Sequence, residues 1–169
     1  MKVKKVNNIL TKNIINEIKN ELKYLQFEIG HTTKENQNKI FTDQMQFEGM
    51  SKCTIPPTNE VENKLNMFGF IITELVCKKI NLKYKNIKRF MWNFYTKGQK
   101  CNFHTDEIGD NFITIIYSFN TCNGYLSVEN DIIEDIKDEA KIFKSNLSHA
   151  GYGPTTETYR INLNIILEI

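Results

Sequence analysis

The stretch IKRFMWNFYT (residues 87–96) decides the fold class of this chain, because its side chains alternate in character. Successive side chains of an extended strand point to opposite faces, so Phe90 and Trp92 would share one face and Asn93 and Tyr95 the other. A face of large aromatic residues is typical of a hydrophobic core, here packed against helices. The stretch therefore predicts a β-strand with one apolar and one partly polar side.

Four further runs downstream are short, rich in β-branched or aromatic residues and separated by turn residues. They are FITIIYSFN (112–120), GYLSVEN (124–130), AKIFKS (140–145) and TYRINLNIILEI (158–169). No periodic segment of helix length interrupts them. We therefore expect largely antiparallel pairing, in a sandwich or a jelly-roll barrel.

The chain before residue 87 has helical periodicity. Apolar residues recur at helical spacing from Ile9 to Leu25, with Thr11 as the N-cap, and again after PPTNE (56–60). Residues 30–58 between these two segments are polar and irregular, which is long for a loop in a compact domain. This segment is either functional or contains a short strand or hairpin.

Size and charge are those of an ordinary globular domain. The 169 residues include 22 basic and 20 acidic side chains, a formal net charge of +2. No strong field therefore steers the protein toward nucleic acid or membranes. We expect a single domain over residues 1–169, in which residues 1–86 form a helical support region and residues 87–169 a barrel core.

The sequence carries no recognisable targeting signal. The basic N-terminal segment lacks an apolar core, and no apolar run reaches the roughly 18 residues that a membrane span needs. The four cysteines show no Cys-x-x-Cys spacing. We interpret them as reduced thiols of a cytoplasmic protein without membrane contact.

The stretch NFHTDE (102–107) contains the first candidate metal ligands. In an extended segment His104 and Asp106 would point the same way. An Fe(II) site of the two-histidine, one-carboxylate kind needs one more histidine from a distant strand. His149, in SNLSHAGYGP (145–154), is the candidate.

The last strand is polar on one face. Arg160, Asn162 and Asn164 alternate with apolar residues. An arginine inside a small barrel would lack a counter-ion unless an anion met it, and its planar fork suits a carboxylate. Metal ligands beside a carboxylate receptor imply a co-substrate that is both a chelator and a dicarboxylate.

Taken together, the segments from NFYTKGQKCNFHTDE to TYRINLNII resemble the 2-oxoglutarate/Fe(II)-dependent dioxygenase superfamily. The similarity covers roughly residues 88–169 and is greatest to small prolyl-4-hydroxylase-like members of bacteria and phages. It implies a double-stranded β-helix (jelly-roll, cupin-like) barrel, α+β but mainly β, with N-terminal helices packed on one side. Family members carry an arginine or lysine about ten residues after the distal histidine, and Arg160 follows His149 by eleven.

The resemblance also implies roles for individual residues. His104, Asp106 and His149 would bind Fe(II), and Arg160 would anchor the far carboxylate of 2-oxoglutarate. The further co-substrate contacts it implies are Tyr95, Asn93, Asn162, Thr114 and Ser118. Many prolyl hydroxylases have a tyrosine at the position of Ser118, and Asn123-Gly124 stands where the family often has Gly-Gly.

Plainer interpretations remain open for several of these residues. Asn93 is equally explained by a hydrogen bond to neighbouring backbone, and Asn164 by a structural role. The basic run that ends at Lys88 and Arg89 is typical of a solvated helix end, although it also suits nucleic-acid contact. His31, in the polar loop, receives no role.

Three functions follow from this reading. The first is an Fe(II)- and 2-oxoglutarate-dependent dioxygenase that uses O2, with ascorbate as reductant, to hydroxylate a prolyl or other peptide side chain or a small molecule, releasing succinate and CO2. The second is oxidative demethylation of alkylated nucleobases. The resemblance disfavours it, because that branch of the superfamily has a second arginine after the first, and this chain has Ile165 and Ile166 there. The third is a non-catalytic, metal-binding cupin-like module.

Overall fold

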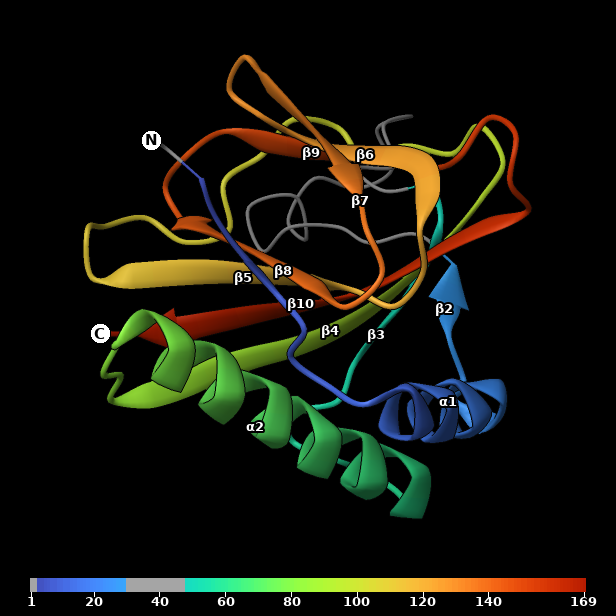
Figure 1. Cartoon of the computed structure of the whole chain (residues 1–169), viewed down its shortest axis with the longest axis horizontal. Helices are drawn as coiled ribbons and strands as arrows, with labels where there is room; N and C mark the ends of the chain where they lie inside the picture. Colours follow the sequence, from blue (N-terminus) through green and yellow to red (C-terminus); the bar gives the residue numbers. More distant parts are fainter. Residues whose placement is uncertain (1–2, 30–47) are drawn as a thin grey trace, which may run out of the picture.

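Two antiparallel β-sheets face each other in the structure, a computed structural model that describes residues 3–29 and 48–169 (Figure 1). The larger sheet has the order β1 (Lys4–Asn7), β8 (Glu139–Lys144), β5 (Phe112–Ser118), β10 (Tyr159–Glu168), β4 (Asn86–Thr96), β3 (Met50–Cys53), β2 (Glu28–Ile29). The smaller sheet has the order β7 (Asp131–Asp135), β6 (Cys122–Val128), β9 (His149–Tyr152). The predicted antiparallel pairing is confirmed.

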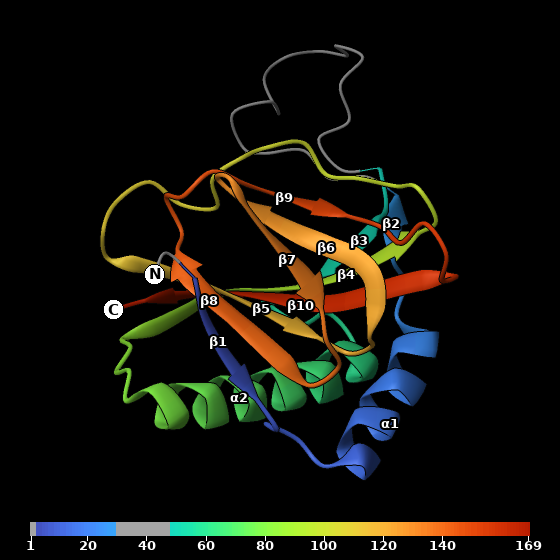
Figure 2. The same cartoon turned by 45° about the horizontal axis from the view of Figure 1, so that its top comes forward.

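Helices cover the face of the larger sheet that is turned away from the smaller one (Figure 2). They are α1 (Lys12–Glu21), the 3₁₀ turn η1 (Leu22–Tyr24) and α2 (Glu60–Ile80). Thr11 caps α1 as predicted, because its side chain accepts a hydrogen bond from the Ile14 amide at 3.4 Å. Asn59 caps α2 by accepting a hydrogen bond from the Glu62 amide at 2.9 Å.

The aromatic face of β4 forms part of the core between the larger sheet and the helices. Phe90 and Trp92 are fully buried there. A Cβ atom on Gly69 of α2 would lie 2.8 Å from the Phe90 ring, so a glycine is needed for the helix to approach the sheet this closely. This packing fixes which face of β4 is left to point toward the smaller sheet.

A second, smaller core lies between the two sheets. Alternation along β5 illustrates the division, because Ile115 belongs to the helix-side core and Ile116 to the core between the sheets. The predicted jelly-roll arrangement and the mainly β class are confirmed. The described strands form two facing sheets rather than a closed barrel, with an isolated bridge between His104 and His149.

The helical support region predicted over residues 1–86 contains strands as well as helices. β1, β2 and β3 all come from this part of the chain and extend the larger sheet at both edges. β1 (KKVN) and β3 (MSKC) are too short and too polar to show a period of two. Edge strands of this kind form through pairing with a neighbour, which a local pattern does not reveal.

The structure describes only part of the segment 30–58. β3 lies within it, which agrees with the predicted short strand, whereas His31 and residues 30–47 lie outside the described residues. Downstream, the sequence did not predict β7 (DIIED) or β9 (HAGY). Within the described part of the chain, no helix has the length and apolar character required to cross a membrane.

Candidate active site

A cavity of about 50 Å³ lies between the two sheets, where β4 and β10 pair side by side. These two strands contribute Arg89, Met91, Asn93, Tyr95, Arg160, Asn162 and Asn164 to its lining. Asn162 lies opposite Asn93 and Arg160 opposite Tyr95 in the strand register. The predicted polar faces of both strands therefore meet in one cavity, with room for several water molecules or part of a small ligand.

The three predicted metal ligands lie together at one end of this cavity, where His104 and His149 line it and the buried Asp106 lies beside them. The candidate ligand atoms of His104, Asp106 and His149 all lie within 4.8 Å of one another. His104 Nε2 is 3.7 Å from Asp106 Oδ1, and His149 Nε2 is 3.4 Å from Asp106 Oδ2. Backbone pairing between His104 and His149 brings the two distant segments together.

Both imidazole rings are oriented by the backbone. His104 Nδ1 lies 2.9 Å from the Asn102 carbonyl oxygen, and His149 Nδ1 lies 3.0 Å from the Leu147 carbonyl oxygen. A carbonyl only accepts, so each Nδ1 carries the proton and each Nε2 keeps its lone pair. His149 Nε2 is buried and has no hydrogen-bond partner among the described residues. This tautomer is the one that binds metals through Nε2.

The carboxylate of Asp106 is fully buried and is held by three donors. Arg89 Nη2 donates to Oδ1 at 2.5 Å, while Thr114 Oγ1 and Asn164 Nδ2 donate to Oδ2 at 2.8 and 3.2 Å. Burial alone would raise the pKa of Asp106, but the charge of Arg89 and the two histidines hold it well below its usual range. Asp106 is therefore an anion, and its two oxygens retain acceptor capacity for a cation.

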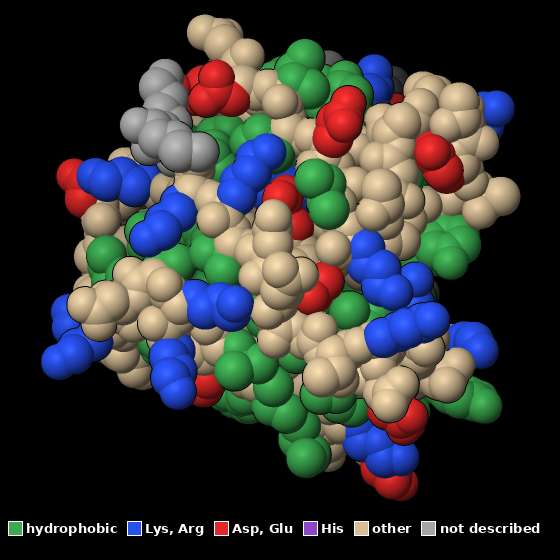
Figure 3. All heavy atoms as spheres, viewed as in Figure 1, with side chains coloured by type: hydrophobic (Ala, Val, Ile, Leu, Met, Phe, Trp, Pro, Cys, Tyr) green, Lys and Arg blue, Asp and Glu red, His purple; other side chains and the backbone are tan. Residues whose placement is uncertain are grey.

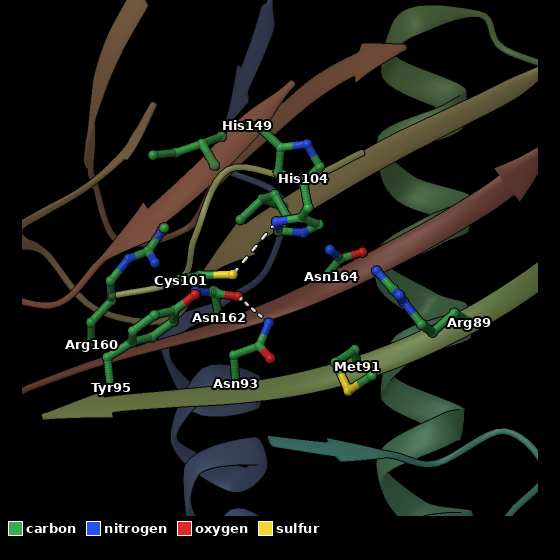
Figure 4. A pocket seen from close by; sticks show the side chains of 13 residues that line it. Arg89, Met91, Asn93, Tyr95, Cys101, His104, His149, Arg160, Asn162 and Asn164 are labelled. Atoms are coloured by element: carbon green, nitrogen blue, oxygen red, sulfur yellow. Dashed lines mark hydrogen bonds between the residues drawn. The ribbon is translucent and has the colours of Figure 1, made fainter. Parts of the chain in front are cut away.

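These residues fit a divalent metal. Two neutral imidazoles and one carboxylate form the ligand set that suits Fe(II) and leaves further positions open. Burial, with the neighbouring His149 as the second cause, lowers the pKa of His104 to about 4, so the His104 ring is neutral at physiological pH. Cys101 lies beside the set, with its Sγ 3.5 Å from His104 Nδ1 (Figure 4).

Arg160 lies at the opposite end of the cavity (Figure 4) and has a counter-ion of its own. Its Nε donates to Asp135 Oδ2 through a short contact, and its Nη2 lies 3.4 Å from Asp135 Oδ1. The anion that a buried Arg160 was predicted to need is therefore supplied by the protein itself, as Asp135 at the end of β7. The third nitrogen of the guanidinium, Nη1, is buried without a hydrogen-bond partner among the described residues.

A buried ionic cluster surrounds this pair. Lys141 Nζ donates to Asp135 Oδ1 at 2.8 Å and to Ser118 Oγ at 2.9 Å, and lies 3.6 Å from Glu139. Burial would raise the pKa of Asp135, but Arg160 and Lys141 overcome this and lower it. Two cations and two anions thus balance one another out of contact with water.

Tyr95 and Gly151 fix the position of the Arg160 side chain. The guanidinium carbon lies 4.8 Å from the centre of the Tyr95 ring, a cation–π distance. A Cβ atom on Gly151 would clash with the Tyr95 hydroxyl and lie 2.9 Å from Arg160 Nη1. The glycine in HAGYGP therefore leaves the space that Tyr95 and Nη1 occupy.

The asparagines behave differently from one another. Asn93 Nδ2 donates to Asn162 Oδ1 at 3.0 Å across the strand pair, so Asn93 bonds to a side chain rather than to neighbouring backbone. Asn164 donates to Asp106, and its Oδ1 is buried without a partner among the described residues. All three line the cavity.

Thr114 and Ser118 do not line the cavity as predicted. Both are fully buried, but Thr114 Oγ1 contacts Asp106 and Ser145, and Ser118 contacts Lys141. Ile116, between them on the same face of β5, is the residue that reaches the lining.

The sequence did not identify three site residues: Arg89, Asp135 and Lys141. Arg89 was assigned to a solvated basic run, although it has the same strand parity as Met91, Asn93 and Tyr95, which was the available signal. Asp135 and Lys141 carried no such signal. Their partners come from other strands, and only the fold brings them together.

Comparison with known proteins supports the fold. A viral collagen prolyl hydroxylase of Paramecium bursaria Chlorella virus-1 is 16% identical, with 100% of this chain and 97% of that chain covered and a TM-score of 0.62. A Trichoplax adhaerens prolyl hydroxylase bound to a hypoxia-inducible-factor peptide is 14% identical over 99% and 83% of the chains, with a TM-score of 0.71. A Burkholderia pseudomallei oxidoreductase of the 2OG-Fe(II) oxygenase family is 11% identical over 99% and 84%, with a TM-score of 0.72.

These likenesses are structural, at low sequence identity. No family model matches the chain, and no curated protein matches it by sequence. The resemblance inferred from the motifs is confirmed at the level of the fold: the chain has the jelly-roll fold of prolyl-4-hydroxylase-like and 2OG-Fe(II) oxygenase structures.

Proposed function

We propose that this protein is an Fe(II)- and 2-oxoglutarate-dependent dioxygenase that hydroxylates a prolyl or other peptide side chain, with release of succinate and CO2. The observation that carries the proposal is the convergence of His104, Asp106 and His149 within 4.8 Å, where both histidines line a cavity whose other end holds Arg160. An anionic metal ligand, Asp106, and a cationic anchor, Arg160, would thus lie at the two ends of one small cavity.

The chain's own residues would divide the work between the two ends. His104, Asp106 and His149 would hold the metal. Arg160, through its unpartnered Nη1, and Tyr95 beside it would hold the far carboxylate of 2-oxoglutarate. The bound metal, with 2-oxoglutarate and O2, would supply the oxidising power that converts a C–H bond into C–OH. Ascorbate would keep the metal reduced.

A peptide substrate is favoured over a nucleobase. The Trichoplax neighbour is a peptide-bound prolyl hydroxylase, which makes a peptide the better starting hypothesis for this chain. The basic run gives nucleic-acid binding little support, because Arg89 pairs with Asp106 and Lys88 lies 3.2 Å from Glu168. We also propose a cytoplasmic location, since all four cysteines are free thiols.

Succinate formation tests the proposal without knowledge of the substrate. Metal-free protein is supplied with Fe(II), 2-oxoglutarate and ascorbate, and succinate is measured for the wild type, Asp106→Asn and Asp110→Asn. Asp110 is the matched control: it is an exposed aspartate four residues away that pairs with Lys144 at 2.9 Å on the surface. We expect Asp106→Asn to lose about a hundredfold in rate and Asp110→Asn to match the wild type.

The anchor is tested with Arg160→Lys, which keeps a positive charge for Asp135 but shortens the reach toward the cavity. We expect the 2-oxoglutarate concentration for half-maximal rate to rise at least about tenfold. A wild type that neither forms succinate nor binds a divalent metal would contradict the proposal and favour a module of another function.

A further inference from the structure

We propose that Arg89 is a positioning residue that serves as the internal counter-ion of Asp106 when no metal is bound, and that it competes with the metal for this carboxylate. The inference rests on the proposed function and adds a residue that the motifs do not contain. It starts from the shortest contact at the metal end, between Arg89 Nη2 and Asp106 Oδ1 at 2.5 Å.

Arg89 is the cation beside the ligand set. Asp106 is fully buried, and its other two donors, Thr114 and Asn164, are neutral. An unpaired carboxylate in this position would be costly, because a buried charge needs a partner. Arg89 is the charged partner of Asp106. Arg89 lines the cavity, whereas Asp106 does not.

The strand geometry places Arg89 there. The register between β4 and β10 shifts between Ile166 and Leu167, so Lys88 has no residue opposite it, while Arg89 pairs with Ile166. A β-bulge of this kind redirects the side chains next to it. Arg89 follows the bulge and points inward, whereas Lys88 pairs with Glu168 at the surface.

The contact between Arg89 and Asp106 can be broken without burying an unpaired guanidinium. Only one nitrogen of Arg89 engages Asp106, its Nε is buried without a partner among the described residues, and its side chain is 21% exposed. A divalent cation bound to His104, Asp106 and His149 would lie a few ångströms from this guanidinium, close enough for strong repulsion. Metal binding would therefore take over the role of Arg89, and Arg89 would lower the metal affinity while it keeps the metal-free site assembled.

The test measures stability and metal affinity, not activity. Metal-free wild type, Arg89→Met and Lys88→Met are prepared at pH 8, melting temperatures are recorded, and Mn²⁺ is titrated with the free ion followed by electron paramagnetic resonance. Lys88→Met is the matched control, since it removes one positive charge from the adjacent position without touching Asp106.

We expect metal-free Arg89→Met to melt about 5 °C or more below the wild type and to bind Mn²⁺ at least about tenfold more tightly. Lys88→Met should match the wild type in both. Arg89→Met with wild-type or weaker Mn²⁺ affinity would overturn the inference while leaving the proposed function intact. A wild type that binds no Mn²⁺ would overturn both.

A second variant keeps the inference testable where Arg89→Met does not fold. Arg89→Lys retains the charge but not the planar fork, so the pair is weakened rather than removed. We expect it to bind Mn²⁺ about threefold more tightly than the wild type, between the wild type and Arg89→Met. Unchanged or weaker Mn²⁺ binding by Arg89→Lys would overturn the inference.

Discussion

An arginine–aspartate pair lies at each end of the cavity, with the arginine in the lining, but the surroundings of the two pairs differ. Arg89 touches Asp106 through one nitrogen and is partly exposed, whereas Arg160 faces Asp135 through two nitrogens and is 1% exposed. The imidazoles of His104 and His149 lie beside Asp106.

The neighbours decide what each pair can do. Lys141 and Glu139 lie beside Asp135, where the imidazoles lie beside Asp106. Asp135 is thus shared by two cations and is not available to a ligand, and Arg160 is left to present Nη1. Among the described residues, the arginine or lysine that pairs with Asp106 is Arg89, and its partly exposed side chain can turn toward solvent. The same two residue types therefore make an anionic site at one end and a cationic site at the other.

Replacing the aspartate of each pair should show the largest difference in stability between the two ends. Asp135→Asn leaves Arg160 and Lys141 buried with one anion between them, and we expect a loss of about 3–5 kcal/mol in unfolding free energy. Asp106→Asn should cost about 1 kcal/mol in the metal-free protein, because Arg89 can turn toward water. Urea denaturation measures both.

Asp131→Asn provides the control, since Asp131 lies on the same strand as Asp135 but is exposed. It should unfold as the wild type does. Equal losses in Asp135→Asn and Asp106→Asn would mean that the two pairs are energetically alike, against the difference described above.

Acid should destabilise the two ends differently. The folded-state pKa of His104 is about 4 in the metal-free protein, against about 6.5 in an unfolded chain. Between these values the unfolded chain binds the extra proton, so stability falls as the pH falls from about 6.5 to about 4, by up to about 3 kcal/mol. Arg160 at the other end, whose pKa is raised, keeps its charge over this range and adds nothing to the slope.

Thermal unfolding of metal-free wild type and His104→Gln over this pH range checks the assignment. The variant should lose that part of the pH dependence that His104 contributes. A slope unchanged in His104→Gln would place the titrating group elsewhere.

Removing the hydroxyl groups of Thr114 and Ser118 on β5 should have the smallest effects, each on the affinity for one ligand. Thr114 donates to Asp106 and Ser118 accepts from Lys141, so one strand supports both ends. Thr114→Val should weaken Mn²⁺ binding about fivefold, and Ser118→Ala should weaken 2-oxoglutarate binding about twofold, each from one lost hydrogen bond. Calorimetric titration of both ligands into both variants tests this crossover, and effects of equal size on both ligands would contradict it.

Much of this site could be predicted from local patterns. The alternation along β4 and β10 is a property of consecutive residues, so it showed that Asn93, Tyr95, Arg160 and Asn162 share a face. His104 and Asp106 are two residues apart, and the backbone alone brings them to one side. His149 was inferred from the need for a further histidine on a distant strand, because no local rule joins it to His104.

The charges were harder to predict because their partners are distant in sequence. Arg160 was expected to need an anionic ligand, and Asp135, twenty-five residues earlier, satisfies it instead. Its strand, DIIED, gave no sign of contributing a fully buried acid. Arg89 looked like one more surface cation beside Lys88. Which charges are buried depends on sheet pairing, and composition does not contain that information.

A crystal structure with Mn²⁺ and 2-oxoglutarate, grown without O2, tests the central claim most directly. The account predicts Mn²⁺ bound by His104, Asp106 and His149 with Arg89 displaced from Oδ1, and a 2-oxoglutarate carboxylate on Arg160 Nη1 while Asp135 stays in place. Metal bound elsewhere, or a 2-oxoglutarate carboxylate that displaces Asp135 or avoids Arg160, would contradict it.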